Sequence, residues 1–205
     1  MEIKDLLRKE LMIMDLKAST KMEAIDEMIE KLKTEGIISD ADEFKKLILA
    51  REEKSSTGIG EGIAIPHAKT EFVKEPALAM GRKMSGIDYD SLDGEPATLF
   101  FMIAAPDGAN NTHIETLARL SQLLLDDDFK EALENAKTSD EVLEIINKAE
   151  AEKFAEVHFA MEAVKNASDI RTDKVEEMKA KLKDPSYFDN IVNSLADKIM
   201  EAYGI

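Results

Sequence analysis

The residues with the clearest chemical potential lie in one segment that joins a glycine-rich loop to a histidine. The segment reads SSTGIGEGIAIPHAK and covers residues 55–69. Pro66 fixes its own φ angle and keeps Ile65 extended, so a strand would run directly into a rigid turn that ends at His67. Because ligands of open α/β sheets bind at the carboxyl ends of strands, we interpret His67 as a nucleophile or general base. The alternative is a strand-end histidine that is hydrogen-bonded to the backbone.

A second histidine lies in the first turn of a helix predicted over residues 110–125. His113 shares a helical face with the leucines at 117, 120 and 124, and an apolar face is the usual setting of a core histidine. The first turn is also the positive end of the helix dipole, and the polar run Asn110–Thr112 precedes it. Free N–H groups at such a helix start can bind an anion, so His113 is a candidate for an anion pocket.

Other polar side chains could contact an anion near His67. Arg51 ends a predicted helix just before the glycine loop, and its planar guanidinium suits bidentate oxyanions. It could equally serve as the cation at that helix C-terminus. The hydroxyls of residues 55–57 could donate to the same anion or could shape the turn. We expect the third histidine, His158, to be structural.

The elements that would position these residues alternate between helices and strands. Apolar runs predict strands over residues 12–16, 62–65, 78–84 and 99–105, of which the last has the continuous apolar pattern of a strand buried on both faces. Helical periodicity predicts helices that start at Ser19 and Asp40, the helix over 110–125, and two more up to about Lys148. This alternation predicts an α/β domain over residues 1–150.

The remaining residues, 151–205, form a predicted helical extension. No strand pattern occurs there, and helices are expected over 151–166, 171–183 and 188–203. Val175, Met178 and Leu182 form one apolar stripe, and a second stripe runs from Ile191 to Met200. Such stripes need a partner surface, so dimerisation, packing within the chain and binding of another protein are all open.

Composition and charge exclude several classes of function. The net charge of −16 argues against direct binding to nucleic acid or to an anionic membrane. The absence of cysteine excludes disulfides, thiolate catalysis and cysteine-based zinc sites. No apolar stretch is long enough to span a membrane and no signal-peptide core is present, so a soluble cytoplasmic protein is expected. Two histidines without an obvious third ligand make a poor zinc set, so we expect no metal and no cofactor.

Two segments resemble the IIA domain (EIIA) of the sugar phosphotransferase system, fructose/mannitol type: Arg51-Glu52 with SSTGIGEGIAIPHAK, and GANNTHIETLARLSQLL. The resemblance covers about residues 1–147 and is closest to fructose-specific IIA. It implies a mixed α/β sandwich with helices on both sides of about five strands. It further implies a phosphotransferase component in which His67 accepts a phosphoryl group from the carrier HPr and passes it to a cysteine of a IIB domain.

The same resemblance implies roles for the neighbouring residues. His113 would stabilise and orient the phosphoryl group, and Arg51 would be an auxiliary anion contact. The glycines at 58, 60 and 62 are expected to let a partner protein approach His67 closely.

The extension carries a second resemblance. The sequence from Asp169 to Leu182, with Tyr187 and the run from Ala196 to Met200, is similar to the C-terminal region of flagellar anti-sigma-28 factors over about residues 165–205. It implies binding of a sigma factor, beside the possible homodimer. The alternative to sugar uptake is therefore a regulatory binding module, similar to nitrogen-regulatory or anti-sigma proteins, whose tail binds a protein partner according to phosphorylation state.

Overall fold

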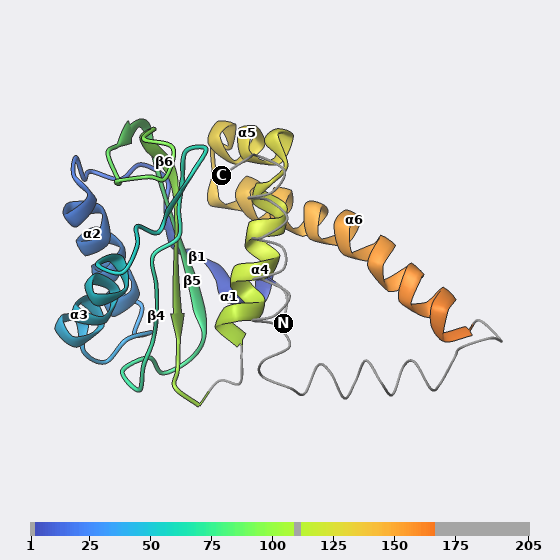
Figure 1. The fold of residues 1–205 in the computed structure, drawn as a ribbon, viewed down its shortest axis with the longest axis horizontal. Helices are drawn as coiled ribbons and strands as arrows, with labels where there is room; N and C mark the ends of the chain where they lie inside the picture. Colours follow the sequence, from blue (N-terminus) through green and yellow to red (C-terminus); the bar gives the residue numbers. More distant parts are fainter. Residues whose placement is uncertain (1–2, 109–111, 167–205) are drawn as a thin grey trace, which may run out of the picture. The chain divides into compact units, whose positions relative to one another are not determined.

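The computed structural model describes residues 3–108 and 112–166 (Figure 1). The chain divides into two compact units, Met1–Ala155 and Glu156–Ile205. Of the second unit, the described part is the end of helix α6 (Ser139–Asn166), which includes the helix predicted over 151–166. The helices predicted over 171–183 and 188–203 lie outside the described residues.

Six strands form a mixed sheet in the first unit. They are β1 (Leu7–Ile13), β2 (Gly58–Gly60), β3 (Ile63–Ala64), β4 (His67–Lys69), β5 (Ala77–Ile87) and β6 (Ala97–Ala105). The order is β1-β5-β6-β3-β2, and β4 also pairs with β6. Strands β5 and β6 are antiparallel, whereas β3 and β4 both run parallel to β6 and follow one another along it.

Strand β6 is the centre of this sheet. Its sequence, ATLFFMIAA, is buried at every position except the half-buried Thr98. Because neighbouring side chains of a strand point to opposite faces, Phe100 and Phe101 belong to two different core clusters. The prediction from the continuous apolar run, a strand covered on both faces, is therefore confirmed.

Helices cover both faces of the sheet (Figure 1). Helices α2 (Lys21–Thr34) and α3 (Ala41–Glu52) supply Ile25 and Ile48 to the core on the Phe100 face. On the Phe101 face lie α1 (Ile3–Leu6), α4 (Thr112–Leu124), α5 (Asp127–Asn135) and the first part of α6. The mixed α/β sandwich implied by the sequence resemblance is confirmed, with six strands where about five were expected.

The starts of α2 and α3 show how local sequence sets the element boundaries. Asp40 caps α3 as predicted, because its carboxylate accepts a hydrogen bond from the Glu43 N–H at 3.0 Å. Helix α2 is capped by Thr20, one residue after the predicted Ser19, through a reciprocal pair of hydrogen bonds between Thr20 and Glu23.

The first strand lies earlier than the sequence predicted. It covers residues 7–13 where 12–16 was expected, because the exposed polar run Arg8–Glu10 in its middle hides the apolar pattern. The sequence prediction also missed the short elements α1, β2 and β4. A segment of two to four residues is too short for periodicity to identify.

A buried carboxylate connects α3 to the segment that leads to His67. Glu52 has a side chain only 7% exposed, and its oxygens accept hydrogen bonds from the Thr57 N–H at 3.0 Å, the Thr57 hydroxyl and the Tyr89 hydroxyl. The Lys21 ammonium lies 3.0 Å from the same carboxylate and 4.7 Å from the centre of the Tyr89 ring. Burial, together with the Glu52 charge, raises the pKa of Tyr89 far above its usual value. This cluster joins α2, α3, the start of β2 and the β5–β6 connection.

Another buried carboxylate lies near the middle of α6. Glu150 accepts the Ile3 N–H at 2.9 Å and the Lys4 N–H at 3.4 Å, and the Arg119 guanidinium lies 3.8 Å away. These contacts attach α6 to the N-terminal end of the first unit.

Replacing Glu52 tests how far the buried cluster stabilises the fold. We expect Glu52→Ala to lower the free energy of unfolding by about 2–3 kcal/mol, because it removes a charged acceptor and leaves Lys21 without its buried partner. The exposed neighbour gives the control, and Glu53→Ala should change stability by less than about 0.5 kcal/mol. Urea unfolding followed by circular dichroism measures both values. Equal stability of the two variants would contradict a structural role for the cluster.

Candidate functional site

His67 lies at the beginning of β4, where backbone hydrogen bonds hold the chain on both sides. It pairs with Ile103 of β6, whose N–H donates to the Pro66 carbonyl at 3.0 Å. Two residues earlier, the Ile65 N–H donates to the Thr57 carbonyl at 2.9 Å. The imidazole itself is half-buried and so remains accessible.

One hydrogen bond determines which nitrogen of His67 can react. Nδ1 lies 2.8 Å from the Ile65 carbonyl oxygen. A carbonyl oxygen only accepts, so Nδ1 carries the proton and Nε2 carries the lone pair. The sequence offered a nucleophile or a histidine bonded to the backbone as alternatives, and the structure shows the backbone hydrogen bond. That bond leaves the Nε2 lone pair available, and the action of His67 as a nucleophile stays a prediction.

The topology brings the start of α4 to the same edge of the sheet as His67. His67 pairs with Ile103, two residues before β6 ends, so it lies close to the edge of the sheet at which β6 ends. The chain leaves β6 at Ala105 and enters α4 at Thr112, and Figure 1 shows α4 beginning near that edge. His113 is in the first turn of α4, and its side chain lies outside the described side chains. Its contact with a phosphoryl group stays a prediction.

The glycine segment shapes the turn between β2 and β3. Gly60 and Gly62 adopt φ angles of 96° and 77° in this turn, a left-handed conformation that is strained for other residues. The turn lies beside Leu99 at the start of β6, whereas His67 pairs with Ile103, about 13 Å further along the strand. That these glycines let a partner approach His67 stays a prediction.

The hydroxyls before the glycines are used by the fold. Ser56 donates to the Tyr89 carbonyl at 2.9 Å and accepts from the Gly58 N–H at 3.1 Å. Thr57 directs both its N–H and its hydroxyl to Glu52. Of the two roles that the sequence allowed for these residues, the structure shows turn formation.

Arg51 lies at the end of α3, a helix that packs against β4. Its Nη1 donates to the Ser55 carbonyl at 2.9 Å, and the side chain is half-buried. One guanidinium nitrogen thus binds the loop that follows α3. The predicted contact of Arg51 with an anion is not tested by this geometry. His158 lies in α6, with a side chain outside the described set.

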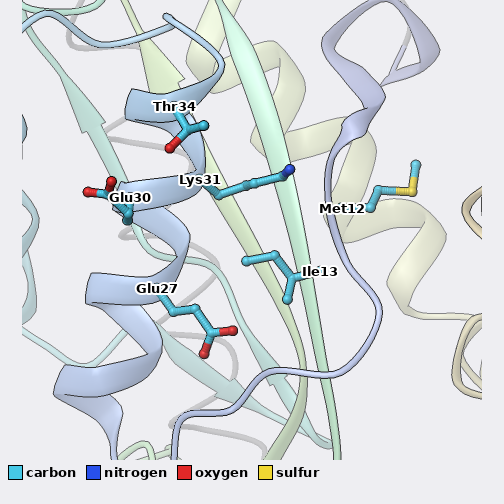
Figure 2. Close-up of a pocket in the computed structure, with 6 residues that line it drawn as sticks. All are labelled: Met12, Ile13, Glu27, Glu30, Lys31 and Thr34. Carbon is cyan, nitrogen blue, oxygen red and sulfur yellow. The ribbon is translucent and has the colours of Figure 1, made fainter.

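A hollow of about 460 Å³ lies on another part of the sheet, between β1 and α2 (Figure 2). Two of its charged side chains, Glu27 and Lys31, already have partners. The Glu27 carboxylate accepts the N–H groups of Lys17 and Ala18, and Lys31 pairs with Glu35 at 3.2 Å. None of the predicted site residues lines this hollow, whose walls are Met12, Ile13, Glu27, Glu30, Lys31 and Thr34.

The part of the chain that the structure describes holds neither a metal-binding cluster nor a membrane-spanning helix. Within residues 3–108 and 112–166, no cluster of three histidine, cysteine or acidic side chains is arranged to hold a metal ion. No helix of that part of the chain has the length and hydropathy needed to span a membrane.

Comparison with known families identifies two regions of the chain. The model of the family "Phosphoenolpyruvate-dependent sugar phosphotransferase system, EIIA 2" matches residues 5–149. The model "Anti-sigma-28 factor, FlgM" matches residues 151–201. Both resemblances drawn from the sequence are confirmed by these matches.

Individual proteins agree with the first match. The fructose-specific EIIABC component of Bacillus subtilis is 50% identical over 147 residues, which are 72% of this chain and 23% of that protein. The fructose-specific EIIA component of Haloferax volcanii is 36% identical, covering 67% of this chain and 89% of the relative. The solved complex of enzyme IIA and phosphorylated enzyme IIB for mannitol from Escherichia coli has a matching chain with 28% identity and a TM-score of 0.61, covering 70% and 99% of the two chains.

The chain therefore belongs to the EIIA 2 family of phosphoenolpyruvate-dependent sugar phosphotransferase systems, whose members are phosphoryl-transferring components. It spans about a quarter of the Bacillus relative and most of the Haloferax relative.

Proposed function

We propose that this EIIA domain accepts a phosphoryl group from the phosphorylated carrier HPr on Nε2 of His67 and passes it to a cysteine of a IIB domain. The hydrogen bond from Nδ1 to the Ile65 carbonyl carries the proposal, because it leaves the Nε2 lone pair free at an accessible strand end. The solved complex of a related IIA with phosphorylated IIB supports the second partner. The fructose-specific relatives support a fructose-type sugar and thus a relay in the cytoplasm.

The transfer needs only a shift of one bond from nitrogen to nitrogen. Nε2 of His67 attacks the phosphorus of the donor phosphohistidine, a new N–P bond forms, and the donor's N–P bond breaks with its electron pair returning to the donor ring. The His67 ring gains positive charge, and the Nδ1 proton stays on the ring, where the Ile65 carbonyl stabilises it. Phosphoryl transfer depends mainly on such positioning and on stabilisation of charge.

The other predicted site residues would act on the phosphoryl oxygens. The start of α4 lies near the His67 edge of the sheet, which supports a role for its N–H groups and for His113 in stabilising and orienting the group. Arg51 retains N–H donors beyond the one bound to Ser55 and would be an auxiliary anion contact.

Phosphorylation with purified components tests the acceptor. After incubation with phosphoenolpyruvate, enzyme I and HPr, the wild type should gain one acid-labile phosphoryl group by intact mass, and His67→Ala should gain none. His158→Ala is the matched control and should behave as wild type. Nitrogen-15 NMR of the histidine ring should place the phosphorus on Nε2. A phosphoryl group on Nδ1, or one that persists in His67→Ala, would overturn the proposal.

The role of His113 has its own expected result. His113→Ala should still accept the phosphoryl group but should pass it to the IIB cysteine about 100-fold more slowly, as expected for loss of one transition-state donor. His113→Gln should recover part of this rate, because its amide can still donate. Rapid-quench kinetics with a fructose-type IIB domain measures the rates. Equal rates for wild type and His113→Ala would contradict a role in transfer and would leave His113 as a residue of the apolar core.

The match of residues 151–201 to anti-sigma-28 factors favours a second function for the same chain. We propose that this segment binds a sigma factor of the flagellar class, and that the phosphorylation state of His67 regulates the binding. The apolar stripe of Val175, Met178 and Leu182 supplies the contact surface in this hypothesis. The competing use of that stripe is dimerisation of the chain.

Binding of the full chain to a flagellar sigma factor separates these uses. Met178→Asp should weaken the complex at least about tenfold, whereas Ala180→Asp, which adds the same charge outside the stripe, should have little effect. Isothermal titration calorimetry is run on phosphorylated and unphosphorylated protein. If no sigma binding is found, and sedimentation shows a dimer that Met178→Asp dissociates, the stripe is a dimer interface and the sigma proposal fails.

A further inference from the structure

A small apolar hollow lies between the β2–β3 turn and the end of α4. Its volume is about 260 Å³, and its walls include Ile59, Ile63, Ser121, Gln122, Leu124 and Leu125. Two apolar side chains at this hollow stay open to solvent, with Ile59 exposed by 45% and Leu125 by 77%. Leu92, exposed by 72%, lies on the segment beside β2, where its N–H donates to the Gly58 carbonyl at 3.0 Å. Clustered exposure of this kind indicates an interaction surface.

This hollow is separate from the His67 site. Ile63 pairs with Leu99 of β6, whereas His67 pairs with Ile103, about 13 Å along the strand. Leu125 follows the last residue of α4, and the first turn of that helix is about 18 Å away along its axis. A partner in the hollow would therefore leave the His67 edge open to a phosphoryl donor.

The charges around the hollow are mostly negative. Lys130 and Lys153 contact residues that line it: Lys130 pairs with Glu61 at 2.5 Å and with Asp127 at 2.8 Å, and Lys153 donates to the Gln122 carbonyl. The Asp93 carboxylate accepts the Glu61 and Glu95 N–H groups, which lower its pKa and keep it charged. The exposed carboxylates of the rim are those of Glu61, Asp93, Glu95, Asp126, Asp127 and Asp128.

This combination selects one kind of occupant. Apolar side chains inside an acidic rim complement a segment that has an apolar face flanked by lysine or arginine. A second copy of the chain carries a net charge of −16 and would meet the rim with like charge. Anionic lipid and nucleic acid are disfavoured for the same reason.

We propose that the hollow lined by Ile59, Ile63 and Leu125 docks a basic amphipathic segment of a partner protein. The apolar face of the segment covers Ile59 and Leu125, and its cations pair with the carboxylates of the rim. The surface works independently of phosphoryl transfer, so the domain can hold this partner and exchange its phosphoryl group at the same time.

A synthetic amphipathic helix built from leucine and lysine serves as the probe, with the full chain as the binding partner. Fluorescence anisotropy gives the affinity, and the matching leucine–glutamate peptide is the control for charge. The Leu–Lys peptide should bind, and the double variant Ile59→Ser/Leu125→Ser should bind it about tenfold more weakly. Met84→Ser, which removes an apolar side chain exposed by 56% elsewhere on the sheet, should bind as wild type. His67→Ala should also bind as wild type.

Amide chemical shifts locate the peptide on the nitrogen-15-labelled chain. The largest shifts are expected at Gly60, Ser121 and Leu125. The proposal is overturned by largest shifts at residues 67–69, by equal binding of the Leu–Glu peptide, or by unchanged affinity of the double variant. It is equally overturned if the free chain self-associates and the double variant abolishes that association. The double variant should still be phosphorylated to the wild-type level. Failure of the docking proposal can then be told apart from failure of the phosphocarrier proposal.

Discussion

The geometry of the candidate site depends on the register in which β4 pairs with β6. His67 pairs with Ile103, two residues before β6 ends, so this register brings His67 close to the edge from which the chain leaves β6 toward α4. The pairing also ties the turn before His67 to β6, because the Pro66 carbonyl accepts from the Ile103 N–H. The imidazole lies against the Ile65 carbonyl, so Nδ1 carries the ring proton and Nε2 keeps its lone pair.

Polar groups near this strand are already hydrogen-bonded within the fold. Glu52 accepts from both donors of Thr57 and from Tyr89, and it neutralises Lys21. A buried carboxylate with this many donors is fully paired, so it stabilises the loop and offers nothing to a ligand. The segment before the glycines therefore fixes the strand, and His67 with the start of α4 remains the candidate for the chemistry.

The sequence predicted the layered fold well because its signals are local. The buried run of β6 and the Asp40 cap involve neighbouring residues, and both were predicted where they occur. The identity of His67 as a candidate was local too, since it follows from Pro66 and the strand before it. The roles of the glycines and hydroxyls were harder to predict from the sequence. A glycine that makes a left-handed turn and one that admits a partner look the same in a sequence, and the partner of Ser56 is Tyr89, 33 residues away.

The boundary between the two family matches falls inside a continuous helix. The first match ends at residue 149, the second begins at 151, and α6 runs through both from Ser139 to Asn166. Glu150, the residue between them, is buried and bound to the N–H groups of Ile3 and Lys4. A flexible linker would need exposed glycine and serine at this point. The junction between the two matches therefore has a buried carboxylate within a helix in place of a flexible linker.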